Sequence, residues 1–404
     1  MTVIEKTSDP TRVHSPRYGS VAWGLPVFFI GALLTTGQMY TPIPLFTTLQ
    51  ERWDAGPAAM AWILSAFAFG YAVGMLLSGP GANRYGFRTL SSVGMVVAGV
   101  VTLLIGFAPS YASVLVLRII QGLVVGTFSP SVMTYIGRAF PPRHRPLGTS
   151  TVTTGFFATV VLSQMASQYL VHHWGPLSVW IVSAAGFFAL ALALRAVMVP
   201  DDPQPGASLW KSVAELSQVF RHARLIPLFA LVAFAMAAGV AVFAGIEATG
   251  AVTDPGELLT LRSVALPFLV AVPFIVLALK RFSLASQMVG SLAVGAAALA
   301  VIGLTDPDPL VIGLAVAVYI ACTGISTPAV LQTAMRIAPE FGASASSALM
   351  FSNYVGATLG PILVTALYGF GLSGIAWVLV GLVALAIAFA AWHLTTSRAE
   401  AAPA

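Results

Sequence analysis

Long runs of apolar residues constrain this 404-residue chain more than any other feature. Twelve such runs occur, each of about 20 residues, the length that a helix needs to cross the hydrocarbon core of a bilayer. They are too long and too uniformly apolar to be the alternating strands of a membrane barrel. We therefore predict an all-α membrane protein of twelve transmembrane helices. The runs lie at 22–45, 58–79, 90–108, 112–136, 148–170, 177–198, 225–247, 260–279, 284–303, 309–334, 343–369 and 372–394.

The composition agrees with a membrane location and excludes several classes of protein. With 58% hydrophobic and only 8% charged residues, a soluble domain would lack a polar surface. The sequence shows no metal-ligand cluster, nucleophile triad or phosphate-binding loop, so we expect no enzyme, no cofactor and no metal. The single cysteine, Cys322, excludes an intrachain disulfide and is expected to be a buried thiol.

The basic residues predict an orientation. If the N-terminus is cytoplasmic, the 19 Lys and Arg residues all fall on the cytoplasmic side except Arg52, Arg118 and Arg262. Loops rich in Lys and Arg are the ones that stay in the cytoplasm. We therefore expect a multi-pass protein of the cell inner (plasma) membrane with both termini cytoplasmic. The net charge of +5 follows from this topology and does not indicate a nucleic-acid surface.

A polar stretch separates the runs into two groups of six. Residues 200–224 begin with the helix breakers Pro200, Pro203 and Pro205 and continue as a short amphipathic segment. The predicted organisation is a cytoplasmic tail at 1–21, a six-helix bundle at 22–199, a cytoplasmic linker with an amphipathic helix at 200–224, a second six-helix bundle at 225–394 and a cytoplasmic tail at 395–404.

An internal repeat relates the two groups. Five positions near the ends of the fourth and tenth runs match at a constant offset of 198 residues. Such an offset is typical of two pseudo-symmetric halves in parallel orientation, with a substrate site between them near the midplane. The matched pairs are Gly126 with Gly324, Pro130 with Pro328, Val132 with Val330, Arg138 with Arg336 and Pro141 with Pro339.

Two short motifs carry a family resemblance. SGPGANRYGFRTL, between the second and third runs, is similar to a Gly-x-x-x-Asp-Arg-x-Gly-Arg loop, and LRIIQG, in the fourth run, is similar to an Arg-x-x-Gln-Gly motif. Both belong to the major facilitator superfamily, and the chain resembles its twelve-span drug:proton antiporter group. The resemblance implies the major facilitator fold and alternating access around a central cavity. The matching residues are Gly79, Asn83, Arg84, Gly86, Arg88, Arg118, Gln121 and Gly122.

The chain departs from the antiporter pattern at two places. Asn83 stands where the family has aspartate, so the loop lacks a carboxylate that the resemblance would assign to gating. The Gly-Pro signature expected late in the fifth run is missing, and a similar pattern, NYVGATLGP, occurs in the eleventh run at Gly356, Gly360 and Pro361. Small residues at this spacing allow close helix packing. Packing and a coupling role therefore both remain open for this segment.

Proton coupling would need a group that changes protonation within the membrane. No apolar run has Asp or Glu in its middle, and Glu247, at the outer end of the seventh run, comes nearest. It is either an exposed carboxylate at a helix end or the coupling acid. We predict that coupling and gating residues are Arg118, Glu247, Gly79, Asn83, Arg84, Gly86, Arg88 and Arg138.

The polar residues within the runs are mostly uncharged, and aromatic residues accompany them. A largely apolar cavity with few neutral hydrogen-bonding groups suits an amphipathic or aromatic organic molecule. Each polar residue alone could instead make a hydrogen bond between helices. The candidate cavity residues are Gln38, Tyr40, Tyr71, Arg118, Gln121, Thr154, Gln164, Tyr319, Asn353 and Tyr354.

Arg118 has two interpretations. It shares a helix stripe with Gly122 and Gly126, at i, i+4 and i+8, where another helix or the cavity can approach. The first interpretation is a charge facing the cavity that couples substrate, proton and conformation. The second is a structural arginine that donates to backbone carbonyls and to Gln38 or Gln121, holding the fourth run against the first.

From these features the sequence predicts a secondary active transporter. Its expected function is export of a hydrophobic or amphipathic small molecule, a drug or secondary metabolite, in exchange for protons. One alternative is uptake or facilitated diffusion of a small organic nutrient, and another is a non-transporting sensor or partner subunit. The expected partners are the substrate, protons and the lipid bilayer, and the chain is expected to be a monomer that does not bind nucleic acid.

Overall fold

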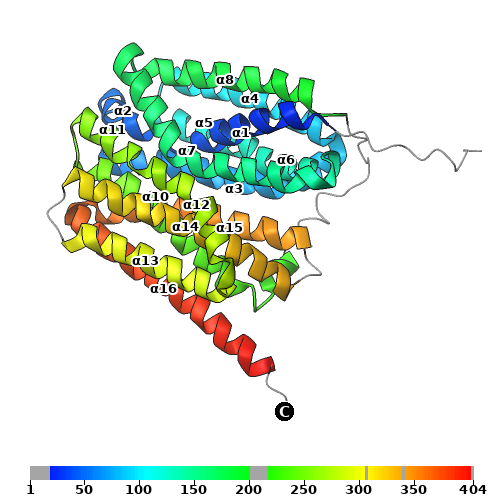
Figure 1. Cartoon of the computed structure of the whole chain (residues 1–404). Coiled ribbons are helices and arrows are strands. Elements are labelled where there is room, and N and C mark those ends of the chain that lie inside the picture. Colours follow the sequence, from blue (N-terminus) through cyan, green and yellow to red (C-terminus); the bar gives the residue numbers. More distant parts are fainter. Residues whose placement is uncertain (1–18, 201–216, 305–307, 339–341, 402–404) are drawn as a thin grey trace, which may run out of the picture.

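The computed structural model describes residues 19–200, 217–304, 308–338 and 342–401, and every regular element within these ranges is helical (Figure 1). Eight segments are long and apolar enough to cross a membrane, judged by length and composition. The remaining predicted spans stay predictions. The amphipathic helix expected within the linker lies outside the described residues. The eight segments are Ala59–Ser78, Phe87–Gly106, Tyr111–Ala139, Pro176–Val197, Ile226–Thr249, Leu284–Leu304, Pro309–Ile337 and Ala348–Phe389.

The helices up to α8 are here called the N-terminal half. Among them α1 packs on α7, α3 on α5, and α4 on α8. Figure 1 shows these helices running roughly parallel or antiparallel to one another in the upper part of the view. The bounds are α1 Val21–Gly37, η1 Ile43–Leu45, α2 Phe46–Trp53, α3 Pro57–Tyr85, α4 Phe87–Gly106, α5 Tyr111–Gly126, α6 Phe128–Ala139, η2 Pro142–His144, α7 Arg145–Trp174 and α8 Pro176–Val197.

The helices from α10 onward are here called the C-terminal half. In this half α10 packs on α15 and α16, and α13 packs on α14 and α16. The bounds are α10 Ile226–Thr249, α11 Pro255–Ser263, α12 Ala265–Ala278, η3 Leu279–Arg281, α13 Leu284–Leu304, α14 Pro309–Ile337, α15 Gly342–Leu367, η4 Tyr368–Phe370 and α16 Gly371–Ala401.

Three of the predicted runs are not single helices. The first ends as α1 at Gly37 and continues through a turn, η1 and the separate α2. The fourth is divided at Thr127 and the eighth at Val264. Each of the latter two breaks comes three residues before a proline, Pro130 or Pro267, whose ring nitrogen cannot donate to the carbonyl four residues earlier. The runs at 22–45 and 260–279 are therefore each built from more than one helix, whereas Tyr111–Ala139 remains one apolar segment long enough to cross a membrane.

Glycines bring two pairs of helices into close contact. On α5, a Cβ atom added to Gly122 would lie 2.1 Å from the carbonyl oxygen of Phe67 on α3. On α15, a Cβ added to Gly356 would lie 1.9 Å from the carbonyl oxygen of Ala233 on α10. No side chain fits at such distances, because backbone cannot move aside as a flexible side chain can. The glycine stripe beside Arg118 therefore faces α3, and the glycines of NYVGATLGP face α10.

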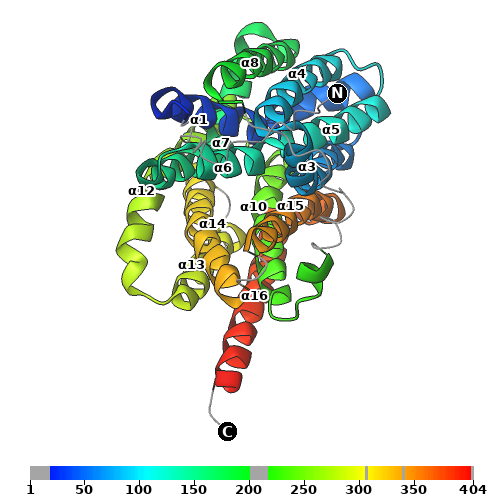
Figure 2. The same cartoon turned by 90° about the vertical axis from the view of Figure 1, so that its right-hand side faces the viewer.

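The two halves meet mainly along α3 and α15, which lie side by side in Figures 1 and 2. Within this contact the Ser65 hydroxyl donates a 2.8 Å hydrogen bond to the carbonyl oxygen of Thr358. On the other side, α7 contacts α11 and α12. Aromatic groups lie in the first of these contacts and a charged pair lies in the second, and both belong to the candidate site.

Candidate functional site

Arg118 is fully buried, with 0% of its surface exposed. Its Nε donates to the carbonyl oxygen of Ile63 at 3.2 Å, and Nη2 donates to the carbonyl oxygen of Gln38 at 2.8 Å. Its Nη1 donates to Oε1 of Gln121 at 2.6 Å. The guanidinium also lies over the ring of Phe67, 4.4 Å from its centroid, which is a favourable cation–π geometry.

Gln121 extends this arrangement into the Arg118 cluster, which comprises Arg118, Gln121, Gln38, Thr102 and Phe67. The Gln121 amide donates to the Thr102 hydroxyl at 2.6 Å and to Oε1 of Gln38 at 3.1 Å. The cluster joins α1, α3, α4 and α5, all in the N-terminal half. In this conformation the charge is enclosed by helices and has no contact with the C-terminal half among the described interactions. These contacts are of the kind expected for a structural arginine.

An aromatic cluster joins the two halves near the middle of α3 and α15. The rings of Tyr71 and Tyr354 stack with centroids 4.2 Å apart. The Tyr71 hydroxyl also hydrogen-bonds the hydroxyls of Thr36, at 3.2 Å, and Ser129, at 2.8 Å. Stacked rings and neutral hydroxyls from both halves thus lie together, as an aromatic solute with polar substituents would require.

A second contact between the halves lies next to this cluster. Tyr40, in the turn after α1, meets Phe243 of α10 edge to face with centroids 6.3 Å apart. Both side chains are buried. Aromatic groups from four elements therefore line the boundary between the halves at this level.

Glu247 and Arg262 form a buried ion pair, with 13% and 2% of their side-chain surfaces exposed. Arg262 also donates to Oε1 of Gln164 at 3.2 Å and to Oε1 of Gln168. Because both glutamines are on α7, the guanidinium of α11 links the N-terminal half to α10 of the C-terminal half. Glu247 is thus paired and largely buried, unlike the exposed helix-end carboxylate that was one expectation.

Sequence reasoning treated Arg262 only as an exception to the charge asymmetry. That exception was the available signal of a functional residue, since an arginine outside the basic cytoplasmic loops and next to an apolar run needs a partner for its charge. Gln164, a predicted cavity residue, is one of these partners and also donates from its amide to the carbonyl of Val160 at 2.5 Å. We refer to Glu247, Arg262, Gln164 and Gln168 as the gate cluster.

The loop motif lies at the opposite end of the helices from the gate cluster. Gly86 has φ of 83° between α3 and α4, a conformation that favours glycine. Arg88 donates to the carbonyl of Arg195 at the end of α8, and Arg138 lies over the ring of Phe87 at 5.0 Å. These contacts tie α4 to α6 and α8 within the N-terminal half. Arg84 is exposed.

Gly79 and Asn83 lie in α3, but their surroundings fall outside the part of the structure that can be described. The other predicted cavity residues are scattered. Thr154 is exposed on α7, and Asn353 is half-buried next to Tyr354. The Tyr319 hydroxyl donates to the carbonyl of Ala235 at 2.6 Å, which ties α14 to α10 within the C-terminal half. Among the described residues no group of three potential metal ligands occurs.

Comparison with known proteins identifies relatives of this chain. The family described as Major Facilitator Superfamily matches residues 28–253. A gallate transporter from Pseudomonas putida is 30% identical over 36% of this chain and 32% of its own length. A 4-hydroxybenzoate transporter from Acinetobacter baylyi is 26% identical over 37% of this chain and 32% of its own. A D-xylose transporter from Levilactobacillus brevis is 27% identical over 44% of this chain and 39% of its own. These alignments span about a third of the relatives' lengths.

One solved structure shares the fold over nearly the whole chain. It is a crystal structure of a POT family transporter in complex with a thioalcohol-conjugated peptide. The TM-score is 0.74 at 16% identity, covering 93% of this chain and 96% of the other. At this identity the similarity concerns the path of the chain and not the ligand.

Proposed function

The chain belongs to the Major Facilitator Superfamily, and we propose that it carries a small organic molecule across the membrane by alternating access. The two halves, predicted as bundles at 22–199 and 225–394, would move against each other around a site at their boundary. The observation that carries this proposal is the stack of Tyr71 on Tyr354, because each half contributes one ring to the same contact.

We propose uptake of a small organic nutrient, with an aromatic acid as the first substrate class to test. Gallate and 4-hydroxybenzoate, named for two relatives, and niacin, named for a third from Acinetobacter baylyi, are all aromatic acids. Stacked tyrosines with neighbouring hydroxyls suit a flat ring bearing polar substituents. Export of a lipophilic drug by proton antiport has less support, since none of these relatives is named for a drug.

The gate cluster supplies a mechanism for opening one end of the carrier. The predicted orientation puts this cluster on the outer side, where its closure would keep a bound substrate from returning. Arg262 donates to both halves at once, so the halves cannot separate there without breaking those bonds. Protonation of Glu247 would remove the attraction that holds the Arg262 guanidinium in place. Opening of the gate cluster would then be coupled to proton binding.

The test is uptake by vesicles that contain the purified protein. Labelled gallate, 4-hydroxybenzoate, niacin and D-xylose would each be offered with and without an imposed pH gradient. We expect at least one aromatic acid to accumulate against its concentration gradient when the outside is acidic, and xylose not to compete with it. Vesicles without protein provide the background.

These assays distinguish proton coupling, the direction of transport and the absence of transport. Accumulation without response to the pH gradient would contradict proton coupling but keep facilitated diffusion. If none of the four compounds enters, and cells expressing the protein instead accumulate less of lipophilic compounds, export replaces uptake. A protein that moves nothing in either assay, although folded by circular dichroism, would contradict transport.

A further inference from the structure

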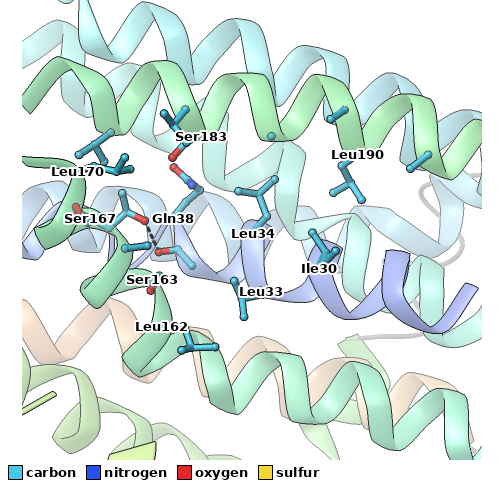
Figure 3. Close-up of a pocket in the computed structure, with 18 of the residues that line it drawn as sticks. Ile30, Leu33, Leu34, Gln38, Leu162, Ser163, Ser167, Leu170, Ser183 and Leu190 are labelled. Carbon is cyan, nitrogen blue, oxygen red and sulfur yellow. Dashed lines mark hydrogen bonds between the residues drawn. The ribbon is translucent and has the colours of Figure 1, made fainter. Parts of the chain in front are cut away.

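A cavity of about 410 Å³ lies between α1, α7 and α8, away from the boundary of the two halves (Figure 3). Its volume is within the range of roughly 300 to 1,000 Å³ typical of small-molecule sites. Neither the gate cluster nor Tyr71 and Tyr354 contribute to its lining. The proposed transport path therefore does not account for this cavity.

The cavity faces the surface that is expected to contact lipid. Ile30 of α1 and Val182 of α8 both line it, and they are 55% and 46% exposed. Exposed apolar side chains on membrane-crossing helices contact hydrocarbon and not water. Whatever fills the cavity is therefore in contact with the bilayer.

Polar and apolar groups are separated along the cavity. Near one end lie Gln38 and Thr41 in the turn after α1, Ser163 and Ser167 of α7 and Ser183 of α8. In Figure 3, Ser183 of α8 and Gln38 of the turn after α1 point toward each other. The other end is lined by residues such as Val27 and Ala193, which have no polar side-chain atoms. An occupant with one polar end and a long apolar remainder fits this distribution.

The dimensions match one leaflet of a bilayer. Along α8 the lining extends from Val179 to Ala193, about 20 Å at 1.5 Å per residue. Half of the hydrocarbon core measures about 15 Å. Ser167 precedes the end of α7 at Trp174, and Ser183 follows the start of α8 at Pro176, each by seven residues or about 10 Å. This places the polar end close to the depth where the headgroup region, about 7 Å thick, meets hydrocarbon.

We propose that this cavity binds the acyl chain of a membrane phospholipid, with the ester carbonyl accepting from the Ser183 hydroxyl or the Gln38 amide, because the Ser167 hydroxyl already donates to Thr41. The lipid belongs to the leaflet on the side of the gate cluster. The acyl chain lies along α1 and α8 and fills the space between them. Transport is not required for this binding.

Binding at this place is connected to the Arg118 cluster. The carbonyl of Gln38 accepts from Arg118 and its Oε1 accepts from Gln121, while the same residue lines the cavity. Ser167 donates to the carbonyl of Thr41 at 2.8 Å, joining α7 to α1 at the polar end. An acyl chain packed here thus stabilises α1 in the position that Arg118 requires.

The experiment uses a phospholipid with a photoreactive diazirine in its acyl chain. The purified full-length protein is placed in nanodiscs of phosphatidylethanolamine and phosphatidylglycerol that contain this lipid. After illumination, mass spectrometry maps the labelled peptides. We expect label to concentrate on residues of α1, α7 and α8 that line the cavity, relative to other lipid-facing helices.

Two substitutions fill the cavity, and a third, on another helix, serves as a matched control. A Cβ added to Gly186 would lie 3.2 Å from the side chain of Leu34, so Gly186→Leu extends into the cavity. Ala189→Leu fills the same space from an exposed position if Gly186→Leu does not fold. Gly381→Leu on α16 adds the same side chain where nothing lies within 4 Å. In Gly186→Leu and Ala189→Leu the added side chain displaces about two methylene groups of the acyl chain from the cavity. The lipid should then bind more weakly, and labelling of the cavity should fall roughly tenfold.

Unchanged labelling in both Gly186→Leu and Ala189→Leu, or equal labelling of all lipid-facing helices, would overturn the proposal. Competition identifies the source of the chain. Unlabelled phospholipid should remove the signal. If free palmitate or 4-hydroxybenzoate removes it while added phospholipid does not, the phospholipid assignment is wrong. These measurements need no transported substrate, so they stand or fall separately from uptake.

Discussion

Nη2 of Arg118 donates a 2.8 Å hydrogen bond to the carbonyl oxygen of Gln38, which directly follows the last residue of α1. The last carbonyls of a helix have no partner within it and carry the negative end of its dipole. A guanidinium placed there satisfies such a carbonyl and meets a favourable field. The cost of burying Arg118 is thereby offset by groups that α1 could not satisfy by itself.

The first prediction concerns this arginine. Arg118→Ala removes three hydrogen bonds, which at about 0.6 kcal/mol each between membrane helices amount to roughly 2 kcal/mol of stability. Arg118→Lys keeps the charge but lacks the planar fork, so it should recover only part of this loss. Thermal unfolding in detergent measures both. If Arg118→Ala unfolds like the natural protein yet cannot transport, the arginine acts in coupling and not in packing.

The second prediction tests the close contact of α3 and α5. Gly122→Ala puts a methyl group 2.1 Å from the Phe67 carbonyl oxygen, and overpacking of this kind costs about 1 to 3 kcal/mol. Gly137→Ala is the matched control, because a Cβ there meets nothing within 4 Å. The control should be neutral or gain up to about 1 kcal/mol from better helix propensity. Equal melting temperatures for the two variants would show that the helices can separate without cost.

The third prediction concerns the ion pair of the gate cluster. Glu247→Gln leaves the Arg262 guanidinium buried without its counter-charge, a change that costs about 3 to 5 kcal/mol when a buried pair is broken. The two halves should then separate more often at the gate cluster. A Val171→Cys reporter, one turn after Gln168 on α7 and outside the gate cluster, should then react faster with an impermeant maleimide, in a Cys322→Ala background that removes the only natural cysteine.

Two further variants make this measurement specific. Glu257→Gln changes an exposed carboxylate of α11 and should leave labelling unchanged. Exchanging the two charges, as Glu247→Arg with Arg262→Glu, should restore slow labelling at least in part. Failure of Glu247→Gln to alter either labelling or the response of uptake to a pH gradient would remove Glu247 from the gate.

The fourth prediction concerns the stacked tyrosines. Tyr71→Phe keeps the ring on Tyr354 but loses the bonds to Thr36 and Ser129, a change of roughly 1 kcal/mol. Tyr71→Ala loses the stack as well and should cost about 3 to 5 kcal/mol. Tyr368→Ala, half exposed on η4, provides a comparison without a buried contact. For a transported aromatic acid, Tyr71→Phe should raise KM more than it lowers the maximal rate. An unchanged KM would place the substrate elsewhere.

The sequence alone predicted the helical class and the positions of most helices. A chain segment in hydrocarbon must satisfy its backbone internally, so an apolar run of sufficient length can be read as a helix without knowledge of its neighbours. The same reasoning was insufficient at Thr127 and Val264, where a proline three residues later interrupts the hydrogen-bond pattern. A proline alone does not predict such a break, because α14 remains continuous through Pro328.

The sequence by itself also singled out Arg118, Gln121, Tyr71, Tyr354 and Glu247 as unusual residues in apolar surroundings. Only the tertiary structure decided what each one contacts. The acceptors of Arg118 include the backbone carbonyls of Ile63 and Gln38. Every residue type has such a carbonyl, so no residue pattern predicts which ones accept. Arg262 meets Gln164 and Glu247 because the two halves dock with α7 against α11. Local composition determines that a helix forms, whereas its partners depend on how distant helices pack, and a single sequence does not encode that packing in any local pattern.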